Sequence, residues 1–245
     1  MRKNPDKHFL EKIRMKAVKA FTDFDLIQQG DRILVALSGG KDSATLLDIL
    51  ANRRRMPGMD YSLASIHIQL PDVGYETDAE YLQTFSEQRN VPFHNIRDHS
   101  PIVKENKQPC FYCAWTRRKL IFEYAHAHGF NKVALGHNAD DFAETLLMNM
   151  LYHGEFSAFS PKQSMFEGKI QIIRPLIYVS NTEAQRYVEL IGFQALAYNC
   201  PFARSNHREH FRKLMKQIKK MSPKALDKIM QAAGNIRPEY LPPQK

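Results

Sequence analysis

The amino-acid sequence predicts an α/β fold in which a parallel sheet carries helices on both faces. Short, almost continuous apolar runs, such as residues 32–37, alternate along the chain with segments of helical periodicity. Such runs are typical of strands covered on both faces, and their alternation with helices is typical of βαβ units. Glycines directly follow the first run, and a helical pattern with Leu46, Leu47 and Leu50 comes next. Strand, turn and helix therefore follow one another in the order of an open α/β sheet.

The remaining elements continue this alternation. Residues 153–169 show neither period and are predicted to form a loop. We expect strands at residues 32–37, 61–70, 93–96, 133–135 and 170–173, and further helices at residues 77–89, 112–128, 140–152 and 183–191.

Helical patterns also lie outside this central region, before Ile33 and across the basic stretch 211–233. The chain is therefore predicted to have three parts. They are a basic helical N-terminal segment (1–30), a central nucleotide-binding domain (31–200) and a basic helical C-terminal segment (201–245).

The positive charge is concentrated at the two ends. The chain has a net charge of +9; residues 1–30 hold seven Lys and Arg against four Asp and Glu, and residues 201–245 hold eleven against three, which leaves −2 for residues 31–200. Basic ends around a mildly acidic middle suit a polyanion held about a central site. Solvated helical surfaces explain the pattern equally well, and a homodimer interface is another use for such ends.

Composition excludes several classes of protein. Hydrophobic residues at 43% and charged residues at 25% are near globular averages, which argues against disorder or a fibrous repeat. No run approaches the ~18 apolar residues of a membrane span, and the start lacks the apolar region of a signal peptide, so we expect no membrane partner. Three cysteines are too few for a disulfide scaffold, which suits a reducing cytoplasm.

The sharpest motif directly follows the first predicted strand and opens a helix. Its sequence is Ser38-Gly39-Gly40-Lys41-Asp42-Ser43. Glycines let backbone N–H groups approach phosphate oxygens, and the following helix adds unpaired donors and the positive end of its dipole. The loop is too short for a Walker motif, and a plain strand-turn-helix connection is the simpler alternative. The whole string favours phosphate binding.

A second motif lies between a predicted strand and helix, at Leu135-Gly136-His137-Asn138-Ala139-Asp140-Asp141-Phe142-Ala143-Glu144-Thr145. Three carboxylates fall in the first helical turn, where they favour the dipole and could hold Mg²⁺ directly or through water. Helix capping is the ordinary role of such residues. Beside a phosphate loop we favour Asp141 as the magnesium ligand, with His137 either touching the nucleotide or packing.

The three cysteines allow several interpretations. Cys110 and Cys113 form a Cys-x-x-Cys before a helix, and Cys200 lies ninety residues further on. They fit a redox pair, a zinc site completed by His207 or His210, or an iron–sulfur cluster with one iron free of protein ligands. Cys200 is equally explained as a buried thiol. Spacing alone does not decide among these.

These motifs resemble those of the PP-loop, or N-type ATP pyrophosphatase, superfamily, in which Ile173-Arg174-Pro175-Leu176 is also a familiar segment. The loop, the Cys-x-x-Cys, the basic Arg117-Arg118-Lys119 and the distant Cys200 are similar to the tRNA 2-thiocytidine synthetases of the TtcA type. The resemblance covers roughly residues 10–205. It implies an adenine-nucleotide alpha-hydrolase-like fold, ATP with Mg²⁺, and a [4Fe–4S] cluster on the three cysteines.

The resemblance also implies roles for individual residues. The phosphate loop, with Ser38, Gly39, Gly40, Lys41, Asp42 and Ser43, would bind ATP together with Gly136 and His137. Asp42 and Asp141 are the candidate catalytic carboxylates, and Cys110, Cys113 and Cys200 the candidate cluster ligands and catalytic cysteines.

The leading hypothesis is an ATP-dependent tRNA sulfurtransferase that adenylates the C2 oxygen of a pyrimidine and replaces it with sulfur carried on the cluster. A cysteine desulfurase or sulfide would supply the sulfur. Phe111, Tyr112 and Trp115 could stack on a base or pack in the core. Two alternatives remain: a PP-loop amidating or lysidine-type ligase with incidental cysteines, and a nucleotide-binding zinc or redox module that acts on a protein partner.

Overall fold

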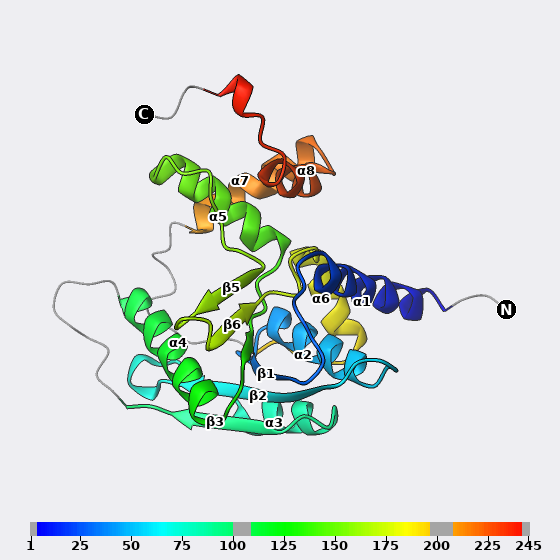
Figure 1. Cartoon of the computed structure of the whole chain (residues 1–245), viewed down its shortest axis with the longest axis vertical. Coiled ribbons are helices and arrows are strands. Elements are labelled where there is room, and N and C mark those ends of the chain that lie inside the picture. Colours follow the sequence, from blue (N-terminus) through cyan, green and yellow to red (C-terminus); the bar gives the residue numbers. More distant parts are fainter. Residues whose placement is uncertain (1–3, 100–108, 197–207, 242–245) are drawn as a thin grey trace. The chain divides into compact units, whose positions relative to one another are not determined.

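The centre of the sheet is β1 (Asp31–Ala36), whose Ile33, Leu34 and Val35 are all fully buried. The computed structural model describes residues 4–99, 109–196 and 208–241. Within them the sheet has six strands in the order β3-β2-β1-β4-β6-β5 (Figure 1). The other strands are β2 (Tyr61–Gln69), β3 (Phe93–Arg97), β4 (Lys132–Ala134), β5 (Lys162–Met165) and β6 (Ile170–Ile173).

The strand order creates a switch point beside β1, which pairs in parallel with β2 on one side and with β4 on the other. The chain runs from β1 through β2 to β3 at one edge, and then resumes at β4 across β1. Open α/β sheets bind ligands outside the carboxyl ends of their strands at such a point. The segments that begin there are residues 37–40 after β1 and residues 135–138 after β4.

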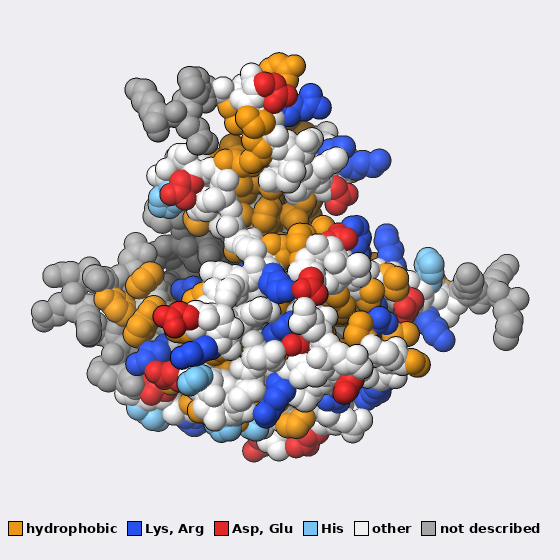
Figure 2. Space-filling view, in the orientation of Figure 1, with side chains coloured by type: hydrophobic (Ala, Val, Ile, Leu, Met, Phe, Trp, Pro, Cys, Tyr) orange, Lys and Arg blue, Asp and Glu red, His pale blue; other side chains and the backbone are white. Residues whose placement is uncertain are grey.

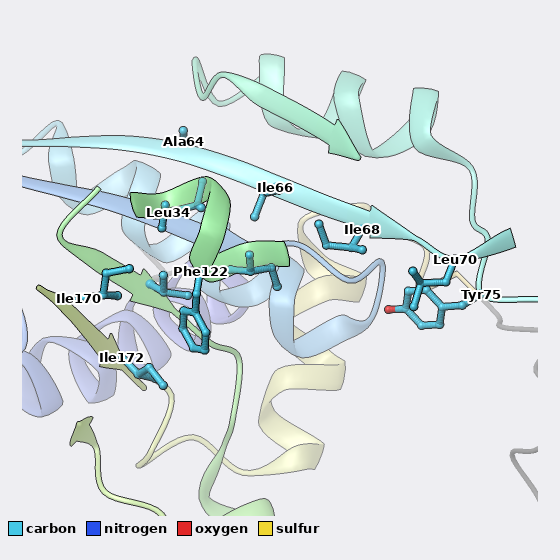
Figure 3. Close-up of a cluster of buried hydrophobic side chains, with 12 residues drawn as sticks. Leu34, Ala64, Ile66, Ile68, Leu70, Tyr75, Phe122, Ile170 and Ile172 are labelled. Carbon is cyan, nitrogen blue, oxygen red and sulfur yellow. The ribbon is translucent and has the colours of Figure 1, made fainter. Parts of the chain in front are cut away.

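One face of the sheet is covered by α4 (Pro109–Ala127). Figure 3 shows Phe122 of this helix with Leu34, Ile170 and Ile172 in one buried cluster. Side chains alternate along a strand, so Ala64, Ile66 and Ile68 of β2 belong to the same face.

The opposite face is covered by α2 (Lys41–Arg54) and α3 (Ala79–Glu87), with α6 (Asn181–Leu190) packed on α2. The Tyr61 hydroxyl donates to the Leu50 carbonyl of α2 at 2.7 Å. The Ser65 and Ser86 hydroxyls are 3.0 Å apart between β2 and α3. The predicted parallel sheet with helices on both faces is therefore confirmed. None of the described helices is both long and apolar enough to cross a membrane.

The N-terminal helix α1 (Pro5–Asp23) joins this layer through a buried carboxylate on α2. Asp48 accepts hydrogen bonds from the Tyr187 hydroxyl of α6 at 2.7 Å and from Arg89 Nε at 2.8 Å. Arg14 of α1 contributes Nη2 at 3.4 Å. Because one carboxylate is shared by three distant segments, α1 is fixed to the layer of α2 and α6.

The prediction of a loop over residues 153–169 was wrong in its second half. Lys162–Met165 form β5, which pairs antiparallel with β6 at the sheet edge. Phe166, Glu167 and Gly168 make the connecting turn with φ values of +52°, +58° and +88°. An edge strand is held by backbone hydrogen bonds and needs no apolar alternation, which explains why Lys-Gln-Ser-Met carried no strand signal.

Contacts divide the chain into two compact units. The first comprises Met1–Asn138 and Ser160–Ser205, and contains the sheet. The second comprises Ala139–Phe159 and Asn206–Lys245. It contains α5 (Ala139–Tyr152), α7 (Arg208–Met221) and α8 (Ala225–Ala233). The division at residues 30 and 200 that the sequence suggested stays a prediction.

In the second unit the basic C-terminal stretch packs on α5. Ala139 and Ala143 of α5 share a buried cluster with Met215 and Leu226. The sequence predicted a single helical stretch here, but it is divided between α7 and α8. Pro223 lies in the break, where its ring cannot continue a helix.

Candidate nucleotide-binding site

The phosphate loop occupies the predicted place, directly after β1 and at the start of α2. Gly39 has a φ of +86°, a conformation that glycine adopts without the cost of a Cβ. Gly40 caps α2 with an extended backbone and no side-chain hydrogen bond. The first N–H groups of α2 therefore have no side-chain cap, and a helix start of this kind binds anions.

The two serines hold the loop in shape. The Ser43 hydroxyl accepts from the Ser38 amide at 3.1 Å and donates to the Gly40 carbonyl at 2.9 Å. Ser43 is only 4% exposed. Both serines were predicted to take part in ATP binding, but in this geometry the Ser43 hydroxyl closes the loop on itself.

His67 of β2 supports the residue that precedes the loop. Its Nδ1 lies 2.8 Å from the Leu37 carbonyl oxygen, and its Nε2 lies 2.9 Å from the Thr77 hydroxyl. Burial lowers the pKa of His67, although the hydrogen bond to Leu37 raises it in part. A neutral imidazole has one donor and one acceptor, which suits a carbonyl on one side and a hydroxyl on the other.

Gly136, after β4, touches the start of α2. A Cβ atom added at Gly136 would lie 3.0 Å from the carbonyl carbon of Asp42 and 3.0 Å from the amide nitrogen of Ser43. Both neighbours are backbone atoms, which cannot move aside as a flexible side chain can. The two segments predicted to bind nucleotide therefore meet at the switch point, and glycine permits that approach.

A polar network then joins three segments of the chain. Lys41 Nζ is 2.6 Å from Asp42 Oδ2 and 2.6 Å from Asn181 Oδ1. The buried Asn138 amide donates to Asp42 Oδ1 at 2.9 Å and to Asn181 Oδ1 at 3.0 Å. Lys41 and Asp42 keep 23% and 27% of their side chains exposed, so this network borders a surface that a ligand can reach.

Sequence reasoning missed two members of this network. Asn138 lay inside the second motif without an assigned role, and Asn181 was not singled out. The one available signal for Asn181 was its place directly after Ser180, the cap of α6, which forms a capping box with Glu183.

His137 lies next to a buried arginine. Arg174, which follows β6, is 6% exposed and donates from Nε to His137 Nδ1 at 3.4 Å. It also contacts the Gln163 side chain at 3.2 Å. Burial, with a smaller contribution from the charge of Arg118, lowers the pKa of Arg174 to about 10. Even so, the guanidinium remains positively charged at neutral pH and offers charge beside His137.

The cysteines are only partly described. Cys113 is partly buried near the start of α4, and Arg117 Nε is 3.4 Å from its carbonyl oxygen. Cys110 lies one helical turn earlier in α4, and its side chain is outside the described part. Cys200 and His207 lie outside the described residues altogether. The described side chains contain no group of three metal-binding residues, so the cysteine assignment stays a prediction.

The acidic residues of the second motif belong to the second unit, on α5. Asp140 and Glu144 are buried and form ion pairs with Lys219 and Arg212 of α7, the latter at 3.7 Å. Asp141 is partly buried, and its carbonyl accepts from the Thr145 hydroxyl at 2.7 Å. Asp140 and Glu144 thus have basic partners, and the assignment of Asp141 as a magnesium ligand remains a prediction.

The parallel sheet, with its short phosphate loop and the glycine-mediated contact at the switch point, defines a nucleotide-binding protein of the PP-loop class. A family model described as a PP-loop domain matches residues 9–217. A tRNA-cytidine(32) 2-sulfurtransferase from Geobacter sulfurreducens is 36% identical over 95% of this chain and 95% of that protein. One from Syntrophotalea carbinolica is 38% identical over 94% and 91%.

This chain therefore belongs to the PP-loop family of tRNA-cytidine(32) 2-sulfurtransferases. Among solved structures, the U34-tRNA thiolase NcsA of Methanococcus maripaludis, with its [4Fe-4S] cluster, has a TM-score of 0.79 and 22% identity over 93% of this chain and 79% of that chain. That likeness confirms the fold.

Proposed function

We propose that this protein is an ATP-dependent tRNA sulfurtransferase that converts a cytidine to 2-thiocytidine, at position 32 as in the names of its relatives. The observation that carries the proposal is the contact of Gly136 with the start of α2, which brings the phosphate loop and the second motif together at the switch point. Family membership favours thiolation over the amidating or lysidine-type alternative and over a zinc or redox module.

The nucleotide step uses the loop for the phosphates of ATP. The cytidine C2 oxygen attacks the α-phosphorus, the bond between that phosphorus and the bridging oxygen breaks, and pyrophosphate leaves with the bond electrons. Amide groups at the start of α2 and the ammonium of Lys41 stabilise the charge that develops on the departing group. Asp42 and Asn181 hold that ammonium at 2.6 Å, so its position is fixed before ATP arrives.

Magnesium would reduce the charge repulsion among the phosphates. Asp141, in the first turn of α5, is the carboxylate that we assign to it. Asp42 is the second carboxylate assigned to catalysis, and its contacts with Lys41 and Asn138 give it a positioning role in the loop.

Cysteine thiolates suit an iron–sulfur cluster. Cys110 and Cys113 lie in the first turns of α4, where the positive end of the helix dipole favours thiolate. Cys110, Cys113 and Cys200 would hold the cluster, whose remaining iron can bind the sulfur that replaces oxygen at C2. AMP leaves from the same carbon.

The sulfur atom must come from outside the chain, and we assign this role to a cysteine desulfurase or to sulfide. Three cysteines are too few for a disulfide scaffold and suit a reducing compartment, so we place the reaction in the cytoplasm. A homodimer is a further proposal, which rests on the basic ends of the chain.

The decisive experiment is mass spectrometry of tRNA nucleosides from a strain that lacks the gene. We expect 2-thiocytidine to disappear and to return with the wild-type gene but not with Cys200→Ser. Persistence of every thionucleoside in the deletion strain would refute the function.

A second measurement tests the cluster separately. Protein purified without oxygen should contain about four iron and four sulfide per chain. Cys200→Ser should lose this cluster while it binds ATP as the wild type does. A colourless protein without iron that still thiolates tRNA would contradict the cysteine assignment.

A further inference from the structure

A groove runs along the first unit between α4 and the hairpin of β5 and β6. It encloses a cavity of about 570 Å³, and both sides come from elements of the same unit. Phe122 and Ile170, which belong to the buried core of the sheet, form part of its lining. The base of the groove is therefore apolar and formed in part by core residues.

Two large aromatic side chains line the groove and remain exposed to solvent. Trp115 of α4 is 51% exposed, and Phe166 of the hairpin is 54% exposed. The rings of Phe122 and Phe166 meet edge to face with centroids 5.6 Å apart. Half-exposed aromatic faces of this kind are the surfaces on which unpaired bases stack.

The backbone conformation of Phe166 indicates that its side chain has a function. Phe166 has a φ of +52°, in the left-handed region that glycine and asparagine occupy far more easily than a bulky residue. A tight turn alone gives no reason for phenylalanine at this position. Residues with a strained backbone cluster at functional sites, and here the side chain borders the groove.

Basic residues surround the aromatic lining. Arg118, Lys119 and Lys169 all line the groove, with Glu123 as an acidic neighbour that lies 3.7 Å from Lys119. Lys119 Nζ also lies 5.6 Å from the centre of the Trp115 ring. In Figure 2, hydrophobic and basic side chains lie next to one another over α4. The groove therefore offers stacking surfaces together with positive charge.

We propose that this groove binds an unpaired nucleotide of the RNA substrate, whose base stacks on Trp115 and Phe166 while its phosphates contact Arg118, Lys119 and Lys169. The proposal deepens the proposed function and rests on it for the identity of the RNA as tRNA. It adds a second contact region on the sheet-containing unit, outside the phosphate loop.

The charge of the groove favours RNA over a second copy of this chain. A symmetric dimer contact through the groove would bring like-charged surfaces together, at a cost in free energy. An RNA strand instead supplies phosphates for the basic residues and a flat base for the aromatic rings. The charge of Arg118 also lowers the pKa of Arg174, which contacts His137.

The chain provides its own probe, because Trp115 is its single tryptophan. We expect an unstructured single-stranded oligoribonucleotide to quench the tryptophan fluorescence, and a duplex of equal phosphate number to quench it much less. Raising the salt concentration should weaken the effect. Absence of quenching by single-stranded RNA, from protein that thiolates tRNA, would overturn the proposal.

Two variants test the aromatic lining with the unmodified tRNA transcript as ligand. Trp115→Ala should weaken tRNA binding by about tenfold, which is the range of one lost stacking contact. Phe166→Asn should weaken it as well, while the melting temperature stays the same or rises because asparagine accepts the positive φ. Met56 is an exposed apolar residue outside the groove lining, so Met56→Ala is the matched control. It should change neither tRNA binding nor the melting temperature.

A charge variant completes the test. Lys169→Gln should lower the salt dependence of single-strand binding by about 0.7 in the logarithmic slope, whereas the exposed Arg55→Gln should leave it unchanged. Wild-type tRNA binding by both folded aromatic variants would overturn the proposal. Loss of a dimer in Trp115→Ala, measured by sedimentation, with tRNA binding intact would assign the groove to a second copy instead.

The proposed function and this inference fail in different ways. If no thionucleoside depends on the protein but single-stranded RNA still quenches Trp115, the groove stands as an RNA site and the function is wrong. If thiolation is confirmed and the groove variants keep the wild-type KM for tRNA, the groove is wrong and the function stands.

Discussion

The paired strands β1 and β4 have a polar cluster at their amino ends and another at their carboxyl ends, and the two clusters differ in their exposure to solvent. At the amino ends, Asp31 and Lys132 form an ion pair of 2.6 Å and are 5% and 2% exposed. Asp31 also accepts from the Gln28 amide and from the Asn131 side chain, and Lys132 donates to the Leu26 carbonyl. This cluster satisfies its charges internally and is closed to solvent.

At the carboxyl ends, Lys41, Asp42, Asn138 and Asn181 form a network that is also hydrogen-bonded but borders solvent. Lys41 keeps 23% of its side chain exposed, and the α2 amides beside it have no side-chain cap. An ion pair is therefore not by itself evidence of a ligand-binding site. A site also needs access and donors that a ligand can use.

The largest expected effect is at the closed end. Lys132→Met removes one partner of a buried pair and leaves the Asp31 carboxylate without its cation, which should lower the free energy of unfolding by about 3–5 kcal/mol. Denaturant titration measures this loss. The double variant Asp31→Asn/Lys132→Met removes both charges and should recover much of it, whereas equal instability of the two variants would mean that the pair is unimportant.

The next effect is at the open end and concerns activity. Lys41→Met should lower the rate of tRNA thiolation by about 10²–10³-fold, the usual loss for a group that stabilises charge in the transition state. Its melting temperature should change little because the side chain is partly exposed. Lys19→Met, at an exposed position of α1, is the control. Near-normal turnover in Lys41→Met would remove this lysine from the proposed chemistry.

A smaller effect is expected at the contact between the two motifs. Gly136→Ala places a Cβ 3.0 Å from backbone atoms of α2, so we expect a loss of about 1–3 kcal/mol in stability together with weaker ATP binding. Calorimetry gives both quantities. In Gly234→Ala the added Cβ meets nothing closer than 3.9 Å, and neither quantity should change.

The smallest expected effect is a pH dependence of stability, and it comes from His67, which supports the residue that precedes the phosphate loop. Burial lowers the pKa of His67 in the folded state, so the unfolded chain binds this proton more tightly. The contribution of neutral His67 is complete above about pH 6.5 and is lost as the pH falls toward the lower folded pKa. Thermal melts between pH 5 and 8 should show this decline in the wild type. A decline of the same size in His67→Gln would contradict the assignment.

Much of the fold could be predicted because its signals are local. The apolar run of β1, the glycines after it and the periodicity of α2 each lie within a few residues, and the structure confirms the sheet that they imply. β5 was missed because an edge strand is held by pairing with β6, and that pairing leaves no pattern in its own four residues.

The sequence alone also predicted the phosphate loop, since its glycines, its lysine and the helix start are neighbours in the chain. Only the tertiary structure decided what surrounds them. Asn181 reaches Lys41 across 140 positions, and Arg174 reaches His137 across 37. Trp115 and Phe166 come to one groove from separate elements. Such contacts depend on how helices pack on the sheet, and a polar or aromatic residue gives no local sign of the partner that packing will bring.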